Sequence, residues 1–137
     1  MNDTEKANRS IVGKIYAAAN RGDLQGVADR FHPDIVLRQA ASLPYGGEFH
    51  GLAATMATLG RMFAEHYEVE ALEVDHIAVD GDLVISAATL RAGIRRTGER
   101  IVMPFRECFV LRDGLVVELQ PFYYDTAALV AAFGASA

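Results

Sequence analysis

The second half of the chain carries the pattern that most restricts its fold. From Tyr67 onward, apolar and polar residues alternate, and turn signals interrupt the alternation at Asp80-Gly81, Thr97-Gly98 and Asp113-Gly114. Alternation with a period of two is typical of strands, and a short glycine-containing pair between two such runs is typical of a hairpin. The segment therefore predicts four consecutive antiparallel strands that are connected as a meander.

The last of these strands contains a proline, which complicates the prediction of its faces. Val117 and Leu119 are expected on one face, and Pro121 then interrupts the strand with a residue that cannot donate to the ladder. Such a proline marks a bulge or an edge. A bulge here would shift the alternation by one residue, so that Phe122 and Tyr124 continue the face of Val117 and Leu119.

Helical periodicity occupies the first half of the chain and the C-terminal end. The spacing of Ile11 and Ile15 predicts a helix from about residue 3 or 4 to residue 20, and Asp23 is a suitable N-cap for a short second helix. A third helix follows Gly51 and ends near His66. Asp125 is the expected N-cap of a terminal helix over residues 127–133.

These elements predict one α+β domain over residues 1–137. Between the second and third helices, residues 35–39 alternate as a strand, and the chain has neither internal repeats nor a linker. All three N-terminal helices precede the meander. They are therefore expected on one face, the concave face, of a single curved antiparallel sheet.

The order of elements, the turn after Arg112-Asp113-Gly114 and the ending Pro-Phe-Tyr-Tyr-Asp at residues 121–125 resemble the nuclear transport factor 2-like superfamily. The SnoaL-like branch is the most similar, and ketosteroid isomerase and limonene epoxide hydrolase are more distant relatives. The resemblance implies a cone-like half barrel whose sheet and helices enclose a pocket. Proteins of this fold include cyclases, isomerases, hydrolases and non-catalytic binders, so the function must be argued from the site.

Three positions depart from what the resemblance implies for catalysis. Ala88, Leu90 and Phe122 correspond to the arginine and the two carboxylates with which the hydrolase-like relatives activate water. Apolar side chains cannot polarise water, so hydrolysis of an epoxide is not expected. SnoaL-like cyclases tend to hold an acidic base at the position of Phe122, which argues against their chemistry as well.

Composition and charge exclude several classes of function. The net charge of −5 and the absence of a long basic run argue against nucleic acid as a partner. The single cysteine, Cys108, cannot form an intrachain disulfide, and no apolar run approaches the roughly 20 residues that a membrane span needs. The polar first ten residues do not form a signal peptide, so we expect a cytoplasmic protein.

Glu107 is the main candidate for acid–base chemistry. The alternation places Met103, Phe105, Glu107 and Phe109 on one strand face, which would surround the carboxyl group with large apolar side chains. Such surroundings disfavour the charged form and raise the pKa toward a value useful in catalysis. In the alternative interpretation, a bulge reverses the faces and Glu107 pairs in solvent with Arg91 or Arg106.

Further candidates supply hydrogen bonds or apolar surface. Tyr16 and Tyr124 each place a hydroxyl at the end of an apolar body, and His50 is expected near the pocket mouth. Each of these three residues also has a purely structural interpretation. The expected ligand-binding residues are Gln39, Tyr45, Met103, Phe105 and Phe122. No cofactor is implied, and the four histidines lack the spacing of a metal site.

Two functions remain open from the sequence. One is an acid–base enzyme of the isomerase or cyclase type acting on a small apolar carbonyl compound, with Glu107, Tyr124, His50 and Tyr16 as catalytic candidates. The other is a non-catalytic module that binds a small apolar ligand. In either case we expect a homodimer formed through the convex face of the sheet, on which Val84, Val102, Val110 and Val116 are predicted to lie.

Overall fold

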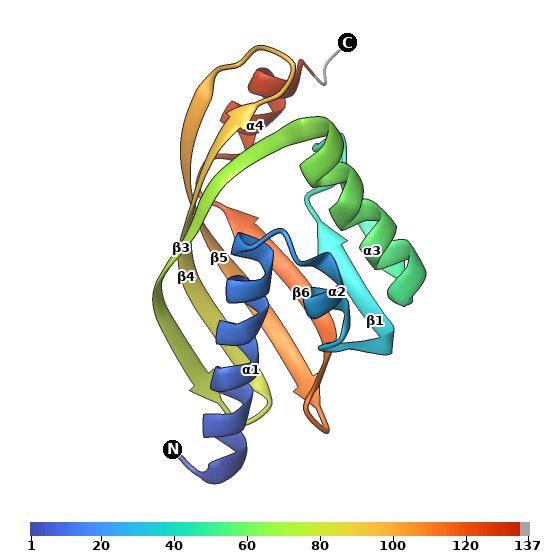
Figure 1. The fold of residues 1–137 in the computed structure, drawn as a ribbon, viewed down its shortest axis with the longest axis vertical. Coiled ribbons are helices and arrows are strands. Elements are labelled where there is room, and N and C mark those ends of the chain that lie inside the picture. Colours follow the sequence, from blue (N-terminus) through green and yellow to red (C-terminus); the bar gives the residue numbers. More distant parts are fainter. Residues whose placement is uncertain (135–137) are drawn as a thin grey trace.

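A curved sheet with helices against one face forms the fold, as the computed structural model describes it for residues 1–134 (Figure 1). The helices are α1 (Asp3–Asn20), α2 (Leu24–Ala28), α3 (Leu52–Arg61), the π-helix η1 (Met62–His66) and α4 (Thr126–Phe133). The strands are β1 (Phe31–Gln39), β2 (Gly47–His50), β3 (Tyr67–Asp80), β4 (Leu83–Ile94), β5 (Arg100–Arg112) and β6 (Leu115–Tyr123). The predicted helices and strands occur in the predicted order, and the short strand β2 between β1 and α3 is an addition to it. The last three residues of the predicted domain lie outside the described residues.

The six strands form one sheet in the order β2-β1-β6-β5-β4-β3. Strands β3 to β6 are paired antiparallel as the predicted meander, whereas β1 pairs parallel with β6 and antiparallel with the short β2. At the last hairpin, Asp113 and Gly114 both have positive φ values of 51° and 80°. Two successive positive φ angles are what a tight hairpin turn requires, and Asp-Gly adopts them readily.

Side-chain caps define where three of the helices begin. Asn2 and Glu5 form a reciprocal capping box at the start of α1. Asp23 accepts a hydrogen bond from the backbone N–H of Gly26 in α2, and Asp125 accepts one from that of Ala128 in α4. Both aspartate caps are as predicted from the sequence.

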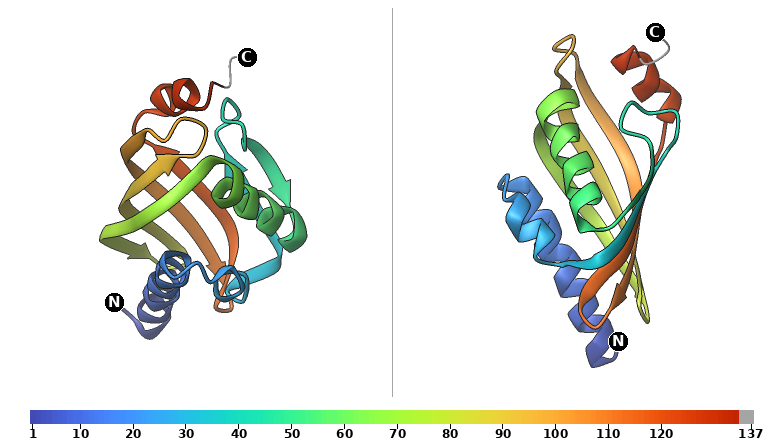
Figure 2. Two further views of the ribbon diagram at one scale, coloured as in Figure 1. Left: turned by 45° about the horizontal axis from the view of Figure 1, so that its top comes forward. Right: turned by 90° about the vertical axis from the view of Figure 1, so that its right-hand side faces the viewer.

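The N-terminal helices cover the concave face of the sheet, as predicted, and α4 lies at one end of it (Figure 2). Val12 and Ile15 of α1 pack in the core with Phe109 and Leu111 of β5. Because the long strands curve around these helices, the two layers enclose space between them. No helix within residues 1–134 has the length and hydropathy that crossing a membrane would require.

The faces of β6 differ from the prediction. Leu111 pairs with Val116 and Val110 pairs with Glu118, so Val117 is the extra residue of a bulge. The alternation therefore shifts at Val117 and not at Pro121, and the prediction for Phe122 and Tyr124 was wrong. The side chain of Phe122 is 52% exposed, Tyr124 is 83% exposed, and Tyr123 points inward instead.

The convex face also differs from the prediction. Val84 and Val116 are fully buried in the core, so their predicted place on the convex face was wrong. Val102 is exposed there, and Val110 is partly exposed. Strand β4 alternates opposite to the expected phase, because Val84 pairs with the inward Phe109.

Candidate functional site

A cavity of about 90 Å³ lies between the concave face and the helices. Its walls come from α1, α2, α3 and η1 on one side and from every strand except β2 on the other. The lining is almost entirely apolar. The polar side chains that reach it are Tyr16, Gln39, Tyr67, Glu107 and Tyr123. One buried water needs roughly 10–15 Å³ of such space, so the cavity holds several waters or a small organic molecule.

Glu107 lies in the middle of β5 and points into this cavity. It pairs across the sheet with Ser86 on one side and with Pro121 on the other. Phe105 and Phe109, two residues away in either direction, are buried on the same face. The inward placement agrees with the strand alternation seen in the sequence.

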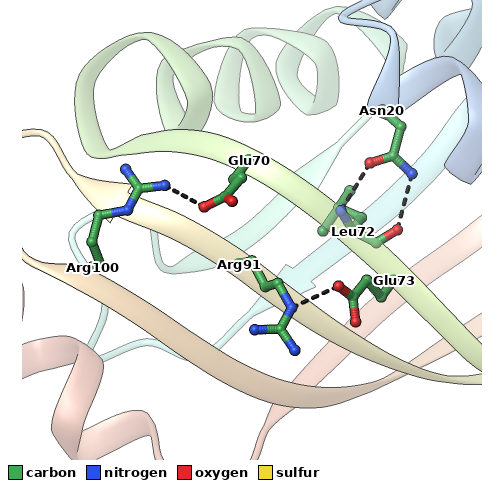
Figure 3. Close-up of polar contacts among 6 residues, drawn as sticks. All are labelled: Asn20, Glu70, Leu72, Glu73, Arg91 and Arg100. Carbon is green, nitrogen blue, oxygen red and sulfur yellow. Dashed lines mark hydrogen bonds and ion pairs between the residues drawn. The ribbon is translucent and has the colours of Figure 1, made fainter.

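The alternative interpretation of Glu107 is wrong, because its suggested partners lie elsewhere. The guanidinium of Arg91 donates to Glu73 at 2.6 Å on the other face of the sheet (Figure 3). Arg106 is exposed and donates to the carbonyl oxygen of Phe105. No cation within residues 1–134 forms an ion pair with Glu107.

One hydroxyl group contacts the Glu107 carboxyl directly, and a second hydroxyl group supports the first. The Tyr16 hydroxyl donates to Glu107 Oε1 at 2.5 Å, and it lies 2.6 Å from Ser86 Oγ. A phenol has one proton, which the carboxylate accepts, so the hydrogen bond between the hydroxyls runs from Ser86 to Tyr16. Helix α1 and strand β4 thereby hold the acid in one orientation.

Burial changes the acidity of both groups in this cluster. Desolvation raises the pKa of Glu107 from its ordinary 4.5 to about 7, and the hydrogen bond from Tyr16 opposes the rise. Burial and the nearby Glu107 charge raise the pKa of Tyr16 well above its ordinary value. At neutral pH, Glu107 therefore populates both protonation states, while Tyr16 keeps its proton.

A second polar cluster consists of a chain of hydroxyl groups that ends on an amide. Tyr45 Oη lies 2.6 Å from Tyr67 Oη and donates to Tyr123 Oη at 3.1 Å, and Tyr123 donates to Gln39 Oε1 at 3.2 Å. Because Tyr45 gives its one hydroxyl proton to Tyr123, the hydrogen bond between Tyr45 and Tyr67 is donated by Tyr67. Gln39 Nε2 in turn faces the sulfur of Met62 at 3.5 Å. Burial raises the pKa of all three tyrosines, so the cluster is neutral.

The predicted site residues divide into those in the cavity and those outside it. Tyr16, Gln39, Phe105 and Glu107 line the cavity. Tyr45 is buried behind Tyr123, and Met103 belongs to the core beyond the cavity. His50, Phe122 and Tyr124 do not line it. His50 lies on the edge strand β2 with its side chain 69% exposed, 3.7 Å from Glu48, because residues 47–50 pair as a strand and turn it outward.

Tyr67 and Tyr123 line the cavity but were not among the site residues predicted from the sequence. Tyr123 could have been found only by locating the bulge at Val117, which has no distinctive residue type. The resemblance implies a catalytic acid position at Phe122, but this side chain faces outward. The inward neighbours are Pro121 and Tyr123, so this part of β6 supplies no carboxyl group.

Within the described part of the chain, no group of three His, Cys, Asp or Glu side chains is arranged to hold a metal ion.

A model of the SnoaL-like domain matches residues 12–119. The chain belongs to the SnoaL-like domain family. The resemblance inferred from the order of elements and the C-terminal motif is thereby confirmed.

Similar SnoaL-like and related proteins span nearly the whole chain. An uncharacterised protein of Mycobacterium tuberculosis is 29% identical over 128 residues, which cover 91% of this chain and 95% of the relative. A nuclear transport factor 2-like protein of unknown function from Burkholderia pseudomallei is 25% identical, with a TM-score of 0.85 and coverage of 93% and 97% of the two chains.

A third similar protein, from Jannaschia sp. CCS1, carries the name of a SnoaL-like polyketide cyclase. It is 19% identical, with a TM-score of 0.84 and coverage of 97% of this chain and 96% of that one. At this level of identity the likeness concerns the fold alone.

Proposed function

We propose that the cavity binds a small apolar molecule with a carbonyl group, and that Glu107 moves a proton between two of its atoms. The observation that carries the proposal is a single carboxyl group with a pKa of about 7 in a cavity whose lining is mostly apolar. A group whose pKa lies near the operating pH acts efficiently as a base and then as an acid. The reaction class is therefore an isomerisation, or a cyclisation that begins with enolisation.

The two oxygens of Glu107 have different roles in this proposal. Oε1 accepts the hydrogen bond from Tyr16, whereas Oε2 has no hydrogen-bond partner within residues 1–134. Oε2 is therefore the atom that takes a proton from carbon. Tyr16 holds the carboxyl plane and remains protonated throughout.

Gln39 is the group that we propose to stabilise the oxygen of the enolate. Its Oε1 accepts from Tyr123, which leaves the Nε2 hydrogens for other partners, and thioether sulfur is a weak acceptor for one of them. Gln39, Pro121 and Glu107 lie in one row across β1, β6 and β5, since Leu37 pairs with Leu119. Two strand spacings separate the backbones of Gln39 and Glu107 by about 10 Å. This span accommodates a carbonyl oxygen at one end and an acidic C–H bond near the other.

A non-catalytic binding module is the second candidate. It is favoured by the nearly complete apolar lining of the cavity, which suits a hydrophobic ligand without any reaction. The Jannaschia protein that is named as a polyketide cyclase shares the fold, which does not by itself distinguish the two candidates. The two candidates differ in whether Glu107 is needed for turnover.

The test is exchange of the acidic C–H protons of small ketones, such as acetophenone and 2-tetralone, in D₂O with NMR detection. Glu107→Gln keeps the shape of the side chain but cannot transfer a proton, so the rate should fall by roughly 10²–10⁴. Glu65→Gln makes the same chemical change on an exposed carboxylate and should leave the rate unchanged. Exchange that persists in Glu107→Gln refutes the enzyme mechanism. Bound ketones without exchange in any variant would favour the binding module.

We also propose that two copies pair through the convex face. Four large apolar side chains on β4, β5 and β6 support this proposal, because 37% to 56% of the surface of each is exposed. They are Leu83, Ile85, Val102 and Phe122. An apolar surface on an open sheet is typically covered by a partner, and two-fold dimers are the commonest assemblies.

A further inference from the structure

A second hollow of about 200 Å³ adjoins the cavity and shares wall residues with it. The shared residues are Ala19, Leu24, Phe63 and Tyr67, and the hollow is completed by Asn20, Gly22, Val69 and Arg95. We call this hollow the vestibule. The common walls place the two spaces side by side, and our inference takes a ligand to reach from the cavity into the vestibule past these residues.

Arg95 lies at the wall of the vestibule, where two backbone carbonyl groups accept hydrogen bonds from its side chain. Its Nε donates to the carbonyl oxygen of Phe63 in η1 at 2.9 Å and to that of Tyr67 at the start of β3 at 3.1 Å. Its backbone N–H also donates to the carbonyl oxygen of His66. These bonds use Nε and leave both terminal nitrogens of the guanidinium group for another partner.

Arg91 and Arg100 already have acidic partners, whereas Arg95 has none among residues 1–134. Arg91 pairs with Glu73 and Arg100 pairs with Glu70, each at 2.6 Å (Figure 3). No carboxylate of the described chain lies within 4 Å of the Arg95 guanidinium. The backbone carbonyls that it contacts offset only part of its charge.

The other polar side chains of the vestibule already have partners. The Tyr67 hydroxyl lies 2.6 Å from the Tyr45 hydroxyl. Asn20 Nδ2 donates to the carbonyl oxygen of Leu72 at 2.9 Å, and its Oδ1 accepts from the N–H of Leu72 at 2.8 Å (Figure 3). The remaining walls are mostly apolar, from Leu24, Phe63 and Val69. The guanidinium of Arg95 is therefore the feature of the vestibule that can select a ligand group.

We propose that the vestibule binds the carboxylate of a ligand whose apolar, carbonyl-bearing part occupies the cavity. The terminal nitrogens of an arginine form a fork that matches the two oxygens of a carboxylate. The net charge of −5 disfavours the approach of an anion, so such a ligand needs a local cation of this kind. The substrate class is then a small keto acid. This inference rests on the proposed function for the occupancy of the cavity.

The test compares two probes of the same size and carbon skeleton, the anion 4-oxo-4-phenylbutanoate and its neutral primary amide, by isothermal titration calorimetry with the full chain. The wild type should bind the acid about three- to tenfold more tightly than the amide, the range expected for a partly exposed charged hydrogen-bonded pair. Arg95→Gln should remove this difference. Arg96→Gln, a matched change at the next residue, should keep it.

Further measurements distinguish a loss of charge at Arg95 from a loss of folding. They also show whether this inference can fail while the proposed function holds. Arg95→Lys retains the charge without the fork and should keep part of the preference, and 0.5 M salt should weaken the preference of the wild type. Equal binding of acid and amide by the wild type, a preference that survives in Arg95→Gln, or binding of neither probe would overturn the inference. If the amide still exchanges its C–H protons in a Glu107-dependent way, the proposed function stands without it.

Discussion

Replacing Glu107 by Gln should make the protein more stable at alkaline pH while leaving it nearly unchanged at acidic pH. In the folded protein the pKa of Glu107 is raised to about 7 from its ordinary 4.5. The folded state therefore binds more protons than the unfolded state between these two values, and its stability falls as the pH rises through them. At 1.36 kcal/mol for each pKa unit, the wild type loses about 3 kcal/mol over this range.

Glutamine has no charge to desolvate, and it still accepts the hydrogen bond from Tyr16. The difference in the free energy of unfolding between Glu107→Gln and the wild type should therefore grow from near zero at pH 4.5 to about 3 kcal/mol at pH 8. Urea unfolding at fixed protein concentration measures it, with Glu65→Gln as the control for the loss of one negative charge. A difference that does not change with pH, or a variant that is less stable at pH 8, would refute the reasoning.

Three further predictions concern the surroundings of this group, the convex face and the terminal helix. Tyr16→Phe removes the hydrogen bond that opposes the effect of burial, so the pKa of Glu107 should rise further in an NMR titration of the carboxyl carbon; an unchanged or lower value contradicts the assignment. Phe122→Arg places a charge on the exposed apolar surface, so sedimentation should show monomers where the wild type forms dimers; a wild-type monomer refutes the dimer. Asp125→Ala removes the N-cap of α4 and should cost about 1 kcal/mol in urea unfolding; no measurable loss would show that the cap is dispensable.

Features that depend on local sequence could be predicted. Asp113-Gly114 adopts the positive φ angles that a hairpin requires, and Asp23 and Asp125 cap the helices that follow them. The strand period also placed Glu107 among inward apolar residues, and desolvation raises its pKa as expected. The turn, the two caps and the inward placement of Glu107 are each determined by residues that lie close together in the sequence.

Features that depend on register between strands could not be predicted. The bulge at Val117 arises from the pairing of β5 with β6. The sequence predicted the bulge at Pro121 instead, because proline cannot donate a hydrogen bond to the ladder. An error of one residue exchanged Tyr123 for Tyr124, since successive side chains of a strand point to opposite faces. His50 was misplaced for a related reason, because β2 forms only by pairing with β1.

The dependence of the exchange rate on pH tests the role of Glu107 most directly. A carboxyl group accepts a proton only when it is ionised, so the rate of ketone exchange per bound substrate should rise with pH and reach half its maximum at about pH 7. The background rate, measured with Glu107→Gln, is subtracted at each pH. A midpoint of about 7 that moves upward in Tyr16→Phe is the result that we expect. A midpoint near the ordinary 4.5, or a rate that stays flat between pH 5 and pH 9, would contradict the assignment of Glu107 as the proton-transfer group.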